Sequence, residues 1–236
     1  MSTARTSIPV HKADIGSGDP ILRICSEACS DDQASEIFRA AYAGDRAVDV
    51  RLLSHIREHT QWLSRGLAVL VRHSSGTRLV AGLNSLMTSD SAPVRAQAAL
   101  LLARARPNAV WGREMLKDPD ARVRANVVEG ARSWCNDRGF VADALRDQHP
   151  RVVCNAVTLL YRLDAAEALA ILHQLANSLD SAFRASAAWA CGFLSDPSTY
   201  LLVRQLRTDP DPGVRWNALR ALTALHRRGV EDLEDM

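Results

Sequence analysis

The chain has 236 residues, of which 47% are hydrophobic, 5% aromatic and 24% charged, and its formal net charge is +2. This length and apolar content allow either a large core or an elongated array of small units. The near-neutral charge argues against a surface dedicated to nucleic acid, and no apolar run is long enough to indicate a signal peptide or a membrane span.

The first segment, residues 1–18, is polar and contains Gly16 and Gly18, so we expect it to be flexible. Residues 19–44 are expected to form one or two N-terminal capping helices. Within them, Phe38 and Tyr42 should face the first helical pair of the following segment.

Residues 45–228 contain a repeated pattern. Five copies share an apolar anchor, followed four, seven and eight positions later by small or apolar residues, which form one stripe along a helix. The anchors are Val94, Val123, Val152, Phe183 and Val214, spaced by 29, 29, 31 and 31 residues. A weaker sixth copy has Leu63 at the anchor position.

Each anchored helix follows an Asp and often a Pro, both of which are typical of helix starts. Examples are Asp118 with Pro119, Asp147 with Pro150, and Asp180. Shorter apolar-periodic segments lie between the anchored helices, so each repeat is predicted to be a helical hairpin. The expected hairpins are residues 45–73, 77–105, 107–135, 137–163, 164–194 and 198–227, and residues 229–236 form an acidic C-terminal tail.

The motif in which Asp precedes Val-Arg, with Ala three residues after the Arg, resembles the HEAT-repeat signature, in particular the short bacterial form similar to phycobilisome-lyase-type repeats. The resemblance covers about residues 60–227. It implies an all-α fold, a right-handed α-solenoid of about six helical hairpins with an N-terminal helical cap. Proteins of this family are scaffolds, adaptors, lyase subunits and a few enzymes.

The resemblance also implies an inter-repeat ladder, in which the Arg after each anchor meets an Asp of the adjoining repeat. The matching residues are Arg95, Arg124, Arg184 and Arg215. Val153 replaces the Arg in the third copy, so the ladder should be interrupted there.

A column of mostly polar residues lies beside the core stripe, on the flank that we expect to line the concave face. Its amides are suited to the main chain of an extended peptide and its arginines to carboxylates or phosphates. The proposed partner-binding residues are Gln97, Arg104, Asn126, Glu129, Asn155, Arg162, Trp189, Phe193, Asn217 and Arg220. The alternative is that the amides bond between repeats and that Trp189 fills space.

Cys25 and Cys29 are four residues apart, as are His55 and His59, which raises the possibility of a zinc site. The pattern lacks the spacing of a zinc knuckle, so we predict no metal and no cofactor. The five cysteines are an odd set, with three at apolar helical positions, and are interpreted as reduced thiols of a cytoplasmic protein.

No catalytic motif is recognisable, and the prediction is a non-enzymatic scaffold or adaptor that binds a protein or peptide partner. One alternative is a nucleic-acid-binding protein similar to HEAT-like DNA glycosylases, which use Trp residues on a concave surface. Against it, Trp111, Trp134 and Trp216 fall at positions that core packing or repeat contacts explain, and the net charge is small. The other alternative, a lyase or chaperone subunit for a modified protein, rests on the resemblance alone. The sequence leaves the oligomeric state open.

Overall fold

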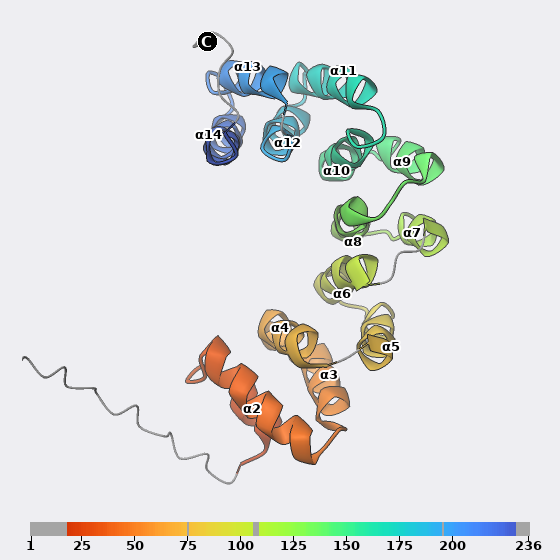
Figure 1. Cartoon of the computed structure of the whole chain (residues 1–236), viewed down its shortest axis with the longest axis vertical. Coiled ribbons are helices and arrows are strands. Elements are labelled where there is room, and N and C mark those ends of the chain that lie inside the picture. Colours follow the sequence, from red (N-terminus) through yellow and green to blue (C-terminus); the bar gives the residue numbers. More distant parts are fainter. Residues whose placement is uncertain (1–17, 75, 106–108, 195, 230–236) are drawn as a thin grey trace, which may run out of the picture. The chain divides into compact units, whose positions relative to one another are not determined.

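The computed structural model describes residues 18–74, 76–105, 109–194 and 196–229 (Figure 1). The predicted flexible N-terminus, except for Gly18, and the acidic tail beyond Gly229 lie outside these residues. All regular elements within the described ranges are helices, which confirms the all-α prediction. The chain divides into two compact units, residues 1–75 and 76–236, and each is considered by itself.

The first unit begins with two helices that differ in length and capping. Ser30 caps the second of them: its hydroxyl accepts from the Gln33 amide while the Gln33 side chain accepts from the Ser30 amide, a reciprocal capping box. The helices of this unit are α1 (Pro20–Ile24), α2 (Asp31–Gly44), α3 (Val48–Glu58), the 3₁₀ turn η1 (Thr60–Trp62) and α4 (Leu63–His73).

Phe38 is fully buried at the centre of this unit and its ring stacks on Tyr42 and on His73 of α4. Arg65 of α4 ties the end of α1 in place, because its guanidinium donates to the Ser26 carbonyl at 2.7 Å and to the Asp31 carboxylate at 3.0 Å. The α2 helix also packs against α4.

The second unit is a two-layer stack of five helical pairs (Figure 1). The first helices of the pairs form one layer: α5 (Gly76–Leu86), α7 (Ala109–Met115), α9 (Arg138–Leu145), α11 (Ala165–Ala176) and α13 (Pro197–Leu206). The second helices form the other layer: α6 (Ala92–Ala105), α8 (Ala121–Gly130), α10 (Pro150–Leu160), α12 (Ser181–Cys191) and α14 (Pro212–Arg227). A 3₁₀ turn, η2 (Ala131–Ser133), extends α8.

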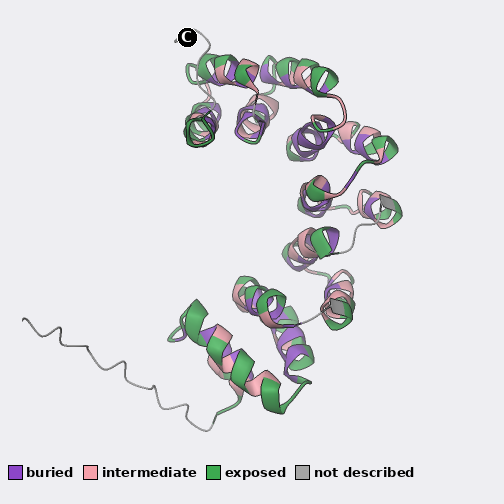
Figure 2. Ribbon diagram, viewed as in Figure 1, coloured by how far each residue is buried: buried purple, intermediate pink, exposed green. Residues whose placement is uncertain are grey.

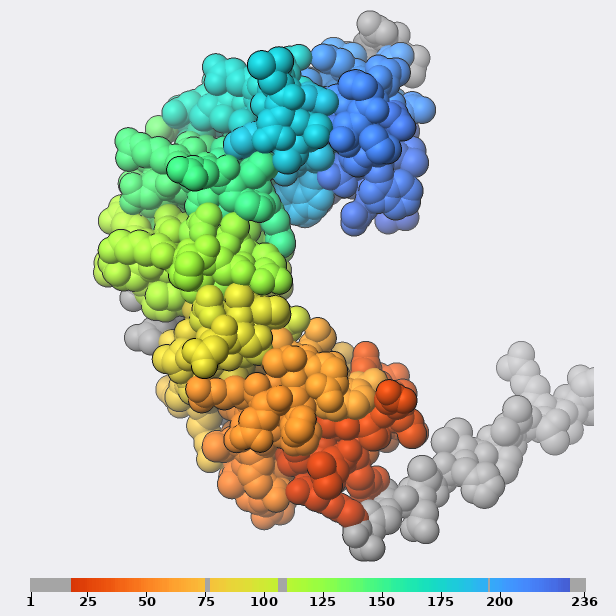
Figure 3. All heavy atoms as spheres, turned by 180° about the vertical axis from the view of Figure 1, so that it is seen from behind, coloured from red at the N-terminus to blue at the C-terminus, as the bar shows by residue number. Residues whose placement is uncertain are grey.

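The second helices carry the core of this unit. Their anchors Val94, Val123, Val152 and Val214 are fully buried, whereas Phe183 is only partly buried. The sequence colours progress in order through the unit in Figure 3, and the main contacts between its described helices join elements of the same pair or of adjacent pairs. The central helix α10 is buried along almost its whole length, as Figure 2 shows.

The helix starts differ in part from the prediction. Asp120 caps α8 and His149 caps α10, each by accepting a hydrogen bond from a first-turn amide. Asp118 and Asp147, which the sequence suggests as start signals, lie two residues earlier and have another role. Asp180 caps α12 as predicted.

All five cysteines are buried and unbonded to one another. Among the described residues, no helix combines the length and the apolar character needed to cross a membrane.

Candidate partner-binding surface

A two-pronged ion pair joins successive repeats of the second unit. In α8, Nε and Nη2 of Arg124 donate to the two carboxylate oxygens of Asp147, at 2.7 and 3.0 Å. The remaining nitrogen, Nη1, donates to the carbonyls of Asp118 and Pro119, which precede the same helix. Each guanidinium thus fixes both its own inter-helix loop and the loop of the next repeat.

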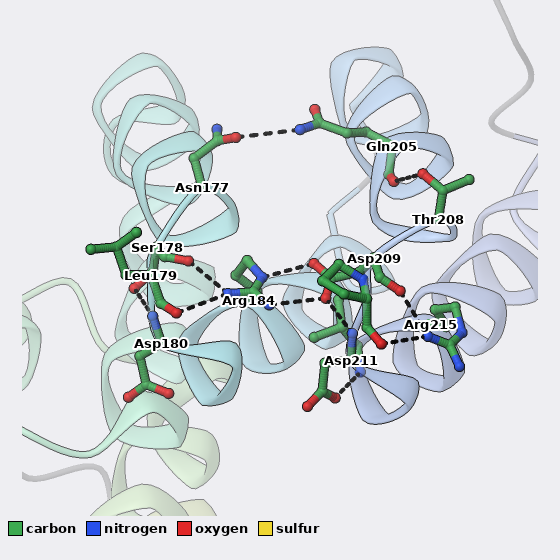
Figure 4. A network of polar contacts seen from close by, with 12 residues as sticks. Asn177, Ser178, Leu179, Asp180, Arg184, Gln205, Thr208, Asp209, Asp211 and Arg215 are labelled. Atoms are coloured by element: carbon green, nitrogen blue, oxygen red, sulfur yellow. Dashed lines mark hydrogen bonds and ion pairs between the residues drawn. The ribbon is translucent and has the colours of Figure 1, made fainter.

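The same arrangement recurs with Arg95 and Asp118, and with Arg184 and Asp209 (Figure 4). In each case the carboxylate also accepts the amide two residues later, which shapes the loop before the next cap. These two pairs and the Arg124–Asp147 pair are the ladder positions that the resemblance implied, with the Asp partner now identified.

At the interface between α10 and α12, both the Arg and the Asp of the ladder are replaced by uncharged residues. Val153 stands where the Arg would be, and Ser178 stands where the Asp would be, since its hydroxyl accepts the amide of Asp180 as the carboxylates do elsewhere. Val153 is buried. The apolar side chain and the neutral hydroxyl therefore leave no unpaired buried charge at this position.

Three of the predicted partner-binding amides bond to the preceding repeat instead. Nδ2 of Asn155 donates to the Ala125 carbonyl at 2.8 Å, and Nδ2 of Asn126 donates to the Ala96 carbonyl at 2.7 Å. Asn217 makes the same bond to a carbonyl of α12 at 2.9 Å.

This geometry supports the inter-repeat role rather than contact with the main chain of a partner. Asn126 and Asn155 are buried, and their oxygens accept hydrogen bonds from Arg151 and Arg132. Both ends of each of these two amides are used within the chain.

The arginines that reach these amides belong to a continuous surface along the second helices. We call it the basic–aromatic strip, and it consists of Arg104, Glu129, Arg132, Arg151, Arg162, Trp189, Phe193 and Arg228. Five of these residues are arginines and only Glu129 is acidic.

Arg132 is the centre of the strip. Its guanidinium carbon lies 4.5 Å from the ring centre of Phe193 and 5.4 Å from that of Trp189, and these two rings lie 4.4 Å apart. Arg228 lies over Phe193 as well, at 5.9 Å. Phe193 nevertheless remains 41% exposed, so the ring is accessible beside two cations.

Positive charge is crowded here. Burial lowers the pKa of Arg132, the charge of Glu129 opposes this, and the charges of Arg104 and Arg151 lower it further. Glu129 is itself shared between Arg151, at 3.2 Å, and Arg104, at 3.7 Å. The guanidinium groups stay protonated at neutral pH, so the strip favours an anionic ligand.

The strip includes five of the ten residues predicted for partner binding: Arg104, Glu129, Arg162, Trp189 and Phe193. Gln97 is partly buried on α6, and Arg220 is exposed on α14. Arg132, Arg151 and Arg228 are not among the residues predicted from the sequence. Arg132 lies in the 3₁₀ turn after α8, where a helical period of 3.6 residues no longer predicts which way a side chain points.

Other candidate features have structural explanations. Trp134 donates from its indole nitrogen to the Ala103 carbonyl at 2.6 Å, and Trp111 packs against the core of the second unit. The rings of His55 and His59 lie against each other in a tilted arrangement, with ring centres 4.3 Å apart. Within the described ranges no three metal-ligating side chains come together.

Stacked helical pairs, joined by a repeating Arg–Asp pair and a repeating amide-to-carbonyl bond, define an α-helical repeat protein. The family model of HEAT repeats matches residues 138–223, from the start of α9 into α14. The matched segment therefore consists of HEAT repeats, as the motif predicted, and the described part of the chain is an all-helical array of stacked pairs. Among solved structures, the designed armadillo repeat protein YIII(Dq)4CqI is similar to it, with 17% identity, a TM-score of 0.40, and coverage of 87% of this chain and 98% of that one. The search of curated proteins found no match.

Proposed function

We propose that the protein is a non-enzymatic scaffold or adaptor that binds an acidic segment of a protein partner through the basic–aromatic strip. Stacked helical repeats commonly bind proteins along an extended surface. The observation that carries the proposal is the exposed Phe193 ring with the Arg132 and Arg228 guanidinium groups over it.

The strip suits carboxylates on a polypeptide. Arginines pair with carboxylates in a two-pronged geometry, as this chain already does within its own ladder, and an exposed aromatic ring provides an apolar anchor beside them. Nucleic acid is the less favoured ligand, because Glu129 lies within the strip and the net charge of the chain is only +2. Five unbonded thiols support a reducing compartment such as the cytoplasm.

The test is fluorescence anisotropy of the full chain with a labelled twelve-residue peptide of Asp, Glu and Leu, and with the same peptide carrying Asn and Gln. We expect the acidic peptide to bind about tenfold more tightly. Phe193→Ala and Arg151→Ala should each weaken its binding about fivefold. Arg146→Ala is the matched control, since Arg146 follows α9 in the other layer and forms an ion pair with the nearby Asp143.

Equal affinity for the two peptides would contradict the proposal, as would an equal effect of all three substitutions. A twelve-nucleotide single strand serves as a further arm at 0.15 M salt. Tighter binding of that strand than of the acidic peptide would replace the proposal with nucleic-acid binding.

A further inference from the structure

Three internal interfaces of the second unit, α6–α8, α8–α10 and α12–α14, combine three contacts in a fixed register. Between α12 and α14, the Nε and Nη2 atoms of Arg184 hold Asp209 of the next repeat. Asn217 of the next repeat donates to the carbonyl of Ala185, two residues after the anchor of α12. Ala188, five residues after that anchor, is fully buried. Positions one, two and five after an anchor therefore face the following repeat.

At the same three positions of α14, no contact with a following repeat is present among the described residues. Nη1 of Arg215 donates to the carbonyls of Asp209 and Pro210, just as Nη1 of Arg184 does to its own loop (Figure 4). Its Nε and Nη2 atoms form no ion pair with any described residue. Trp216 and Leu219 occupy the second and fifth positions, and they are 61% and 48% exposed.

The residue types are as informative as their exposure. Exposed faces of stacked helical repeats are usually polar. Here Trp216 stands where three internal repeats have Ala and one has Cys, and Leu219 stands where they have Ala or Val. The prediction that repeat contacts explain Trp216 is not met within the described residues, because more than half of its side chain is exposed.

We propose that this face, formed by Arg215, Trp216 and Leu219, binds a helical pair of another polypeptide that stacks as a further repeat. The ligand carries a carboxylate in the loop before its second helix, which fills the open fork of Arg215. An amide in the second turn of that helix reaches the Trp216 carbonyl, and an apolar helix face covers Trp216 and Leu219. The surface is distinct from the basic–aromatic strip and does not depend on the function proposed for it.

Two observations select this occupant. The fork is cationic and has the same loop contacts as three forks that each hold an Asp. The matching amides of this chain, Asn126, Asn155 and Asn217, are already bonded inside it, which disfavours a second copy as the ligand. A repeat-type partner satisfies both requirements.

The probe is a labelled synthetic peptide that copies residues 137–163, the α9–α10 pair, because its Asp147 and Asn155 make these contacts inside the array. Its binding to the full chain is followed by anisotropy. We expect Arg215→Ala in the protein and Asp147→Asn in the peptide each to weaken binding about tenfold, and the two together to have little further effect. Trp216→Ala should also weaken binding. Arg220→Ala, an exposed arginine on the same helix, is the matched control and should leave binding unchanged.

Failure of the peptide to bind up to 1 mM would overturn the proposal, as would binding that Arg215→Ala leaves intact. Two further measurements test the other possible ligands of this face. Sedimentation equilibrium tests a second copy of the chain, and a variant lacking residues 230–236 tests that segment. Self-association that Arg215→Ala abolishes would identify a second copy instead, and peptide binding that appears only after removal of residues 230–236 would identify that segment.

Discussion

The residue directly after the anchor and its partner in the following repeat form an ion pair at some interfaces and are both uncharged at another. Arg124 pairs with Asp147, and both side chains are mostly buried, at 16% and 9% exposure. Val153 and Ser178 occupy the corresponding places in the next repeat, with no charge at all. A buried ion pair and a well-packed neutral pair can be nearly equal in stability, whereas half an ion pair is costly because the remaining charge is desolvated without compensation.

This difference predicts the effect of replacing Arg124 and Asp147 by the residues found at Val153 and Ser178. Arg124→Val alone should lower the free energy of unfolding by about 2 kcal/mol, because the Asp147 carboxylate loses its partner. The double variant Arg124→Val, Asp147→Ser should lie within about 1 kcal/mol of the wild type. Urea unfolding followed by far-UV circular dichroism measures both. A double variant that is less stable than the single one would show that a serine in place of Asp147 cannot shape the loop as Ser178 does.

The second helices approach each other closely where a glycine permits it. Gly130 ends α8 against α6, and a Cβ atom added there would lie 2.5 Å from the Ala103 Cβ and 2.7 Å from the Leu100 carbonyl oxygen. The carbonyl belongs to the backbone of α6, so a rotamer change cannot relieve the overlap. The two helices would have to separate.

Gly130→Ala is therefore expected to destabilise the second unit by about 2 kcal/mol, despite the higher helix propensity of Ala. Gly44→Ala is the control, because Gly44 also ends a helix but a Cβ atom added there would meet nothing within 4 Å. This control should change stability by less than about 1 kcal/mol. Thermal unfolding of both variants tests the difference. Equal midpoints for the two would mean that α6 and α8 are not held at this distance.

The sequence predicted the helical pairs well and the surface only in part. The apolar stripe repeats every 29 to 31 residues, and burial of Val94, Val123, Val152 and Val214 follows from it directly. Whether the amide of Asn155 faces solvent or the neighbouring helix depends on the distance between two helices, which periodicity does not encode. The position of Arg132 depends on a 3₁₀ turn that the residue types of this segment do not predict.

Carboxylates stabilise the molecule as a whole, and this makes it sensitive to acid. The hydrogen bond from Arg184 lowers the pKa of Asp209, and the Val214 amide at the start of α14 lowers the pKa of Asp211. The same direction of pKa change holds for Asp120, Asp147, Asp164 and Asp196. A pKa that is lower in the folded state gives stability above the unfolded value of about 3.9, and that stability is lost as the pH falls through the folded value.

The free energy of unfolding should therefore fall steeply between about pH 4.5 and pH 2, where these carboxylates protonate. Urea titrations at several pH values across this window measure the slope. The slope should be shallower in the variant Arg124→Val, Asp147→Ser, because one of the carboxylates is absent. A free energy that stays constant across this window would contradict the role given to the ladder and the caps.

The interruption of the ladder has a chemical consequence. Val153 and Ser178 leave the α10–α12 joint without an ion pair, and the same two helices carry Cys154 and Cys191, whose charged forms would repel each other. Burial raises the pKa of both thiols, that of Cys191 to about 12. Because the thiolate is the reactive form, burial and the raised pKa should slow the modification of both sulfurs by electrophiles and oxidants in the folded chain. The interface between α10 and α12, which lacks the ladder ion pair, is thus the place where thiol reactivity would report local opening of the stack.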